Sequence, residues 1–152
     1  MRTSHLSLFL LLAATPACSS SSSGTAGQDT GGDGGGGGAP ATFTQIYTDI
    51  IAKQCVECHQ PGQIGVTDGM LDMSTQATAF TNLVNADSTG EACNSKGKRV
   101  TPGDADKSIF YLKVSDDDPS PCGEKMPFGL PPLTGAESDE IEGWINAGAM
   151  ND

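Results

Sequence analysis

Cys55-Val56-Glu57-Cys58-His59 is the most informative segment of this 152-residue chain. Its two thiols are about one helical turn apart, so both can react with one flat ligand while the adjacent imidazole lies beneath it. Thioredoxin-like redox pairs and zinc knuckles share the first four positions of this pattern. With the histidine included, the pattern is that of covalent c-type haem attachment.

The segment that precedes this motif predicts an amphipathic helix. Thr42 and Gln45 have the spacing of a capping box, and apolar residues recur at helical intervals over residues 43–51. The helix is expected to run into Cys55. Both thiols and the imidazole therefore lie at its carboxyl end.

Further helices are expected downstream, separated by long loops rich in proline and glycine. They are a helix over about 75–85 with Ser74 as its N-cap, a helix from Asp104 or Asp106 to about Val114, and a last helix that begins at Thr134, where Glu137 completes a second capping box, and stops at Gly148. No alternation of strands and helices is visible. The sequence predicts an all-α domain of about four short helices.

The N-terminal part of the chain has the features of an export signal. Residues 1–17 carry a basic start and a short apolar run, Leu6–Ala14, which as a helix is only about 14 Å long and too short to cross a bilayer. Cys18 follows an imperfect lipobox and is expected to be lipidated, with ordinary signal-peptidase cleavage as the alternative. Residues 18–40 predict a Ser/Gly-rich flexible linker, which leaves 41–152 as one folded domain.

Charge and compartment narrow the classes of partner. The chain has 19 acidic and 8 basic residues, a net charge of −11, which makes nucleic acid and anionic membrane surfaces poor partners. Export leads to the oxidising side of a bacterial inner membrane, where haem attachment and disulfide formation both occur. We expect a periplasmic or outer-membrane protein that contacts a membrane only through a lipid on Cys18.

The motif early in the domain and the later Met126-Pro127 pair together resemble a monohaem class I cytochrome c. The resemblance implies a small cytochrome c fold, with long loops around one covalently attached haem c and with the first helix crossing the last. Cys55 and Cys58 would form the thioethers to this haem. His59 would be its proximal iron ligand.

The sixth iron ligand is expected to be a methionine. The only other histidine, His5, lies in the segment that is removed. Met126 is preferred because Pro127 favours an extended backbone before it and because the family places its axial methionine just before the last helix. A methionine packed in the core is the alternative. The methionines of the domain are Met70, Met73, Met126 and Met150.

With Cys18 assigned to lipid and the motif thiols to haem, two cysteines remain. Cys93 and Cys122 are expected to form a disulfide, which would close a loop of about 30 residues and stabilise the fold by about 3.5 kcal/mol. The bridge would lie close to Met126 in the sequence and restrain that loop. The rival interpretation combines these two cysteines with Cys55 and Cys58 in a zinc site, which leaves His59 without a role.

Two loops are given supporting roles. The apolar residues of the loop over 62–73 are expected to form a pocket wall: Ile64, Val66, Met70, Leu71 and Met73. The only basic cluster of the acidic domain, Lys96, Lys98 and Arg99, is expected to be a solvated loop, with contact to haem propionates or to a partner as the alternative.

Electron transfer by one His/Met-ligated haem is the function that these features predict. The protein would be a monomeric carrier and no enzyme itself, although it could serve an oxidoreductase as a subunit or domain. Its redox partners are expected to offer a basic docking face. Two alternatives stay open: a haem with an exchangeable distal site for ligand sensing or peroxidase-like chemistry, and a haem-free disulfide or zinc lipoprotein.

Overall fold

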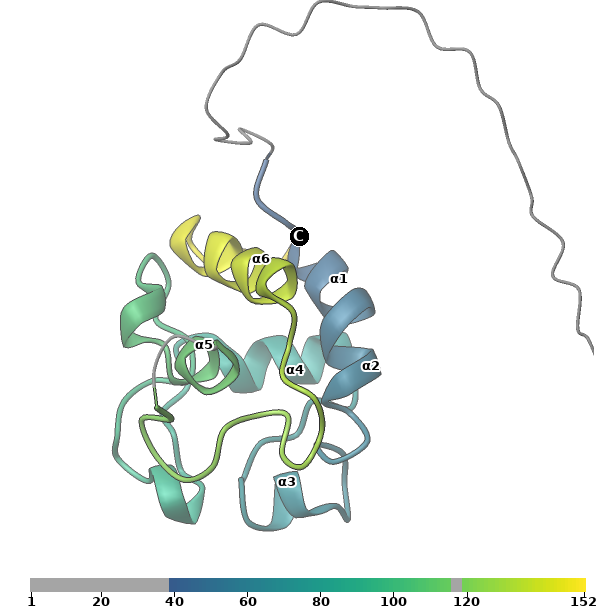
Figure 1. Cartoon of the computed structure of the whole chain (residues 1–152), viewed down its shortest axis with the longest axis vertical. Helices are drawn as coiled ribbons and strands as arrows, with labels where there is room; N and C mark the ends of the chain where they lie inside the picture. The colour runs from purple at the N-terminus through teal and green to yellow at the C-terminus, as the bar shows by residue number, and fades with distance from the viewer. Residues whose placement is uncertain (1–38, 116–118) are drawn as a thin grey trace, which may run out of the picture. The chain divides into compact units, whose positions relative to one another are not determined.

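The computed structural model describes residues 39–115 and 119–152 (Figure 1). Within these ranges the secondary structure is helical, without a β-strand, and only isolated bridges such as Val84 with Val100 pair extended segments. The all-α prediction is confirmed for this part of the chain. The expected signal peptide, Cys18 and nearly all of the expected linker lie outside the described residues.

The first helical segment leads into the Cys55–His59 motif. Its parts follow one another without a break: α1 (Phe43–Ile46), the π-helical turn η1 (Tyr47–Ile51) and α2 (Ala52–Gln54). Thr42 and Gln45 form the predicted capping box, because the Thr42 hydroxyl accepts from the Gln45 backbone N–H and the Gln45 side chain accepts from the Thr42 backbone N–H. Cys55 is the C-cap of α2, as expected from the sequence.

A short helix, α3 (Ile64–Thr67), interrupts the predicted loop after the motif. It folds back onto the motif, since the Gly65 N–H donates to the Cys58 carbonyl at 2.9 Å. The next helix, α4 (Gln76–Leu83), begins with Thr75 as its N-cap, so the prediction of Ser74 was wrong by one residue. The Ser74 N–H is instead bonded to the Asp72 carboxylate at 2.8 Å.

The predicted helix from Asp104 to Val114 is divided in two. Asp104 caps a single 3₁₀ turn, η3 (Ala105–Lys107), and α5 begins only at Ile109 and ends at Val114. The division occurs at Ser108, which is fully buried and extended. Its hydroxyl donates to the Asp104 carbonyl at 2.8 Å and accepts from the Thr101 N–H at 2.8 Å, which holds it outside a helical conformation.

The last helix, α6 (Gly135–Asn146), matches its prediction closely. Thr134 and Glu137 form the predicted capping box at its start. The chain turns after its end, where Gly148 has a positive φ of 111°, a conformation that glycine adopts without steric cost. None of the helices in residues 39–115 and 119–152 is long and apolar enough to cross a lipid bilayer.

The hydrophobic core lies where α6 packs against α1 and α5. Trp144 of α6 stacks on Phe43 of α1 with ring centroids 5.1 Å apart, and Phe80 of α4 meets the same ring edge-on at 5.2 Å. Phe43 and Trp144 are buried, and a fully buried apolar side chain contributes roughly 1.5–3 kcal/mol. The core therefore fixes the first, fourth and last helices relative to one another.

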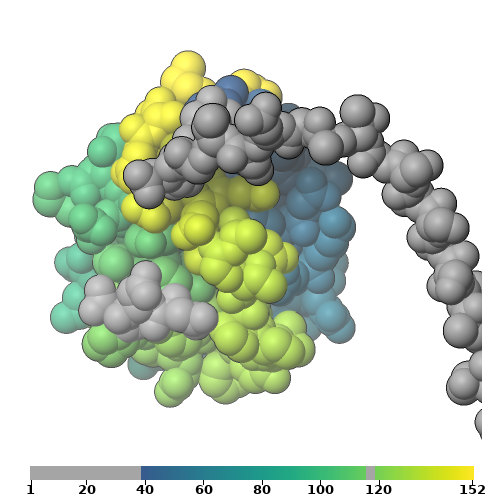
Figure 2. All heavy atoms as spheres, turned by 45° about the horizontal axis from the view of Figure 1, so that its top comes forward, coloured from purple at the N-terminus to yellow at the C-terminus, as the bar shows by residue number. Residues whose placement is uncertain are grey.

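The two ends of the folded part lie side by side (Figure 1). Asp152 binds the start of α1: its carboxylate accepts from the Phe43 N–H at 2.9 Å and its carbonyl accepts from the Thr44 N–H at 3.1 Å. These bonds satisfy donors at the N-terminus of α1, which would otherwise have no partner within the helix. In the space-filling view C-terminal residues border the visible part of the first described segment at the top of the domain (Figure 2).

Candidate functional site

A cavity of about 560 Å³ lies beside the motif. Cys55, Cys58 and His59 line it from the end of the first helical segment, and Met126 lines it from the loop before α6. The cavity has a volume within the range of roughly 300–1,000 Å³ that is typical of cofactor sites. Most of the remaining wall is apolar, with Ile64, Leu71, Met73, Leu83, Ile109, Phe110, Val114 and Leu133 among the lining residues.

Both cysteines of the motif are free thiols in the structure. Cys55 is half-buried, and burial together with the neighbouring Cys58 raises its pKa to about 12. Cys55 is therefore a neutral thiol near pH 7. A thioredoxin-like redox pair needs the opposite shift, since its attacking cysteine has a lowered pKa.

His59 is half-buried, and the carbonyl oxygen of Leu71 lies 2.9 Å from its Nδ1. Burial lowers the pKa of the imidazole; the bond to Leu71 opposes this effect, and the positive charges of Arg99 and Lys113 lower the pKa further. The ring is therefore neutral near pH 7, with Nδ1–H donated to the carbonyl. This tautomer leaves the lone pair of Nε2 available to a metal.

Two of the predicted methionine candidates line the cavity, Met126 and Met73. Met126 is half-buried, and its N–H donates to the Lys113 carbonyl at 2.8 Å. Met73 belongs to the core, with 2% of its surface exposed, and its N–H donates to the His59 carbonyl at 2.8 Å. Met70 and Met150 are more than half exposed and do not line the cavity. Met126 is thus the lining methionine that comes from a different segment than His59.

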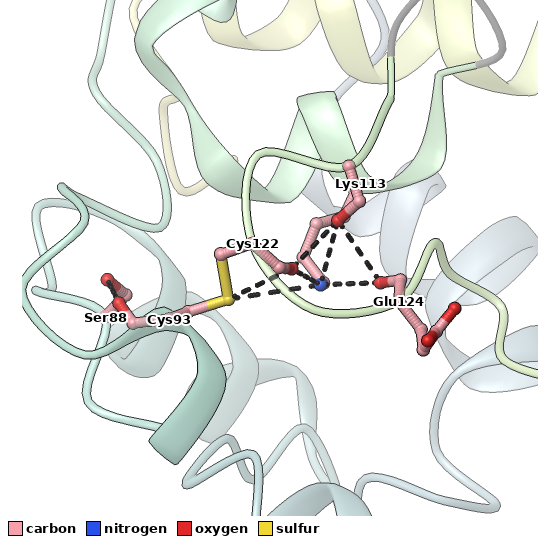
Figure 3. Close-up of a disulfide and its surroundings, with 6 residues drawn as sticks. Ser88, Cys93, Lys113, Cys122 and Glu124 are labelled. Carbon is pink, nitrogen blue, oxygen red and sulfur yellow. Dashed lines mark hydrogen bonds between the residues drawn. A yellow bond between two sulfur atoms is a disulfide. The ribbon is translucent and has the colours of Figure 1, made fainter.

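The predicted disulfide is present between Cys93 and Cys122, whose Cα atoms are 5.2 Å apart. Figure 3 shows Lys113 beside it, with the ammonium group donating to the carbonyls of Cys122 and Glu124 at 2.7 Å each. These are charge-assisted hydrogen bonds, which are stronger than neutral ones. The loop that carries Met126 is therefore fixed both by a covalent bridge and by a lysine of α5.

The disulfide also excludes the four-cysteine zinc site, because it consumes Cys93 and Cys122. Among residues 39–115 and 119–152, no group of three or more His, Cys, Asp or Glu side chains is arranged to hold a metal ion.

Arg99 lines the cavity, and the prediction of a solvated loop was wrong for this residue. It is 8% exposed, and its guanidinium donates to the Met70 carbonyl at 2.6 Å and to the Asn82 carbonyl at 2.9 Å. Its neighbour Lys98 is near the surface, where its ammonium nitrogen lies 3.2 Å from a carboxylate oxygen of Asp87. The only local sign of burial in the sequence is the apolar Val100 that follows.

The pocket-wall prediction is correct for part of its set. Ile64, Leu71 and Met73 line the cavity, whereas Val66 and Met70 do not. Val66 is half-buried outside the lining, and Met70 is more than half exposed.

No protein-family model, curated protein or solved structure matches this chain. Its function is therefore inferred from the residues around the cavity and from their contacts.

Proposed function

We propose that this protein is a c-type cytochrome, an electron carrier of small cytochrome c fold with one covalently bound haem c. The observation that carries this proposal is that two free thiols, a neutral imidazole and a methionine line one apolar cavity. Cys55 and Cys58 would hold the haem as thioethers, with His59 and Met126 as axial ligands. When bound, the haem would supply a one-electron couple between ferric and ferrous iron.

The residues present suit such a group. The Leu71 carbonyl fixes the imidazole of His59, so that Nε2 needs no proton release before it can bind iron. The largely apolar wall suits the apolar faces of a porphyrin. A thioether from Met126 would favour the ferrous state and raise the reduction potential relative to a second histidine. The packing of α6 against α1 also agrees with the helix crossing expected for this fold.

The partners proposed for this carrier are redox proteins with a basic docking face. Asp68, Glu91 and Glu124 are exposed, and each contributes to the lining of the cavity. The two cations of the lining, Arg99 and Lys113, donate to carbonyl groups of the chain itself. Since Arg99 is buried and Lys113 is half-buried, the exposed charges that a partner would meet at this surface are negative. We place the carrier in the periplasm or at the outer membrane, with Cys18 as the lipid acceptor.

The test is to produce the exported protein in a host that attaches c-type haem and to extract the purified protein with acid. The haem should remain with the polypeptide in the wild type and in a Cys93→Ser/Cys122→Ser control. It should be lost from a Cys55→Ser/Cys58→Ser variant. Colourless protein, or haem released by acid from the wild type, would contradict the proposal.

An optical spectrum with a redox titration then separates the two haem functions. An electron carrier should show a methionine-to-iron charge-transfer band and reversible one-electron titration. Ready binding of carbon monoxide by the reduced protein, without that band, would instead support the exchangeable distal site.

A further inference from the structure

We infer that Gly65, Gly69 and Gly90 are positioning residues for His59: they pack in a row that leads from the imidazole to the disulfide. This inference extends the proposed function, since the orientation of the ring matters most when Nε2 binds iron. It depends on the space available at each glycine, which the structure defines closely.

The row begins at the ring itself. A Cβ atom on Gly65 would lie 2.6 Å from His59 Nδ1 and 2.6 Å from the Cys58 carbonyl oxygen. Non-bonded heavy atoms pack at roughly 3.5–4.0 Å. Neither neighbour is free to yield, because Nδ1 is bonded to Leu71 and the Cys58 carbonyl accepts from the Gly65 N–H.

The row continues through backbone atoms alone. A Cβ on Gly69 would lie 2.5 Å from the Gly65 carbonyl oxygen, and a Cβ on Gly90 would lie 2.5 Å from the Gly69 carbonyl oxygen. The Gly65 carbonyl also accepts from the Leu71 N–H at 3.0 Å, so a shift at Gly69 would reach the residue that holds the imidazole.

Glycine is required at these three positions because a side chain would not fit, and not because the backbone needs a positive φ. None of the three has a positive φ, whereas Gly62, with a φ of 87°, has no atom within 4 Å of its Cβ position. All three line the cavity. In the described part of the chain these three are the glycines at which an added Cβ would lie closer than 3.0 Å to another atom, and they follow one another from the imidazole to Gly90.

The far end of the row is covalently anchored. Gly90 precedes η2 (Glu91–Cys93), and the Cys93 N–H donates to the Gly90 carbonyl at 2.9 Å. Cys93 is bonded to Cys122, which lies in the loop of Met126. One cross-link thus supports the wall behind His59 and the loop of Met126 at the same time.

The test replaces each glycine by alanine and reads the state of the imidazole in the reduced protein as purified. Nitrogen-15 NMR reports the Nδ1–H that bonds Leu71, and redox titration reports the midpoint potential. Gly65→Ala should lose or strongly shift the Nδ1–H signal and shift the potential, with smaller shifts for Gly69→Ala and Gly90→Ala. Gly143→Ala in α6, where no atom lies within 4 Å of the new Cβ, should change neither readout.

A second control separates positioning from general loss of stability. Ile141→Ala truncates a fully buried side chain of α6 that does not line the cavity, so it should lower the melting temperature while leaving the Nδ1–H signal unchanged. Folded glycine variants with a wild-type imidazole signal would overturn the inference. So would failure of all three variants to fold, since the glycines would then serve the domain and not His59. A haem-free wild type would defeat the proposed function alone, because the NMR readout needs no haem.

Discussion

Met126 and Met73 can be distinguished at the level of single residues. We expect Met126→Ala to open the sixth coordination position, so that the midpoint potential falls and the reduced protein binds carbon monoxide. Met73→Leu, which keeps the volume of a core residue, should leave the charge-transfer band in place. If the charge-transfer band were lost in Met73→Leu and retained in Met126→Ala, Met73 would be the ligand instead. The exposed Met150→Ala serves as the reference.

Arg99 supports the cavity wall through its charge-assisted hydrogen bonds. Arg99→Met would leave the carbonyls of Met70 and Asn82 without their donor, so the free energy of unfolding should fall by about 2–3 kcal/mol. Lys96→Met, at an exposed position of the same cluster, should stay within about 0.5 kcal/mol of the wild type. Urea unfolding measures both. Equal effects of the two substitutions would contradict the role given to Arg99.

The contrast between His59 and Arg99 shows what sequence reasoning can reach at this scale. A role for His59 is predicted because haem attachment would require neighbouring residues in a fixed order, and His59 does line the cavity. Arg99 was misjudged because its acceptors, Met70 and Asn82, come from two other segments of the chain. A buried charge with distant partners leaves no local pattern to recognise.

At the level of elements, the capping boxes are expected to be independent contributions to stability. Thr134→Ala removes the hydroxyl that accepts from the Glu137 N–H, so unfolding should become easier by about 1 kcal/mol. Thr81→Ala in the middle of α4 removes a similar hydroxyl without a capping role and should be neutral or slightly stabilising. Thermal unfolding of the two variants, compared with the wild type, checks the difference.

The helices whose starts depend on residues close in the sequence were predicted well. The starts of α1 and α6 depend on side chains three positions apart, so their capping boxes were predicted correctly. The start of α5 depends on Ser108, which is held extended by Thr101 and Asp104 in a buried environment. The π-helical turn of the first segment and the short helix α3 had no recognisable local signal.

For the whole molecule, the disulfide is the strongest single restraint on the loop of Met126. The Cys93→Ser/Cys122→Ser variant should lose about 3.5 kcal/mol of stability, because the unfolded chain regains the entropy of an open loop of about 30 residues. The methionine-to-iron band should also disappear at a lower temperature than in the wild type. If urea unfolding and the band both remained unchanged, Lys113 alone would be sufficient to hold the loop.

Asp152 keeps the beginning and the end of the domain together, and α3, which lines the cavity through Ile64 and Gly65, lies at the other end (Figure 1). A domain attached to a solid support by either terminus would therefore present the α3 side of its cavity to the surrounding solution. With the proposed haem in the cavity, such a film on an electrode would exchange electrons with soluble mediators more readily than with the support. The direction of attachment thus becomes a practical means of choosing which side of the molecule takes part in current flow.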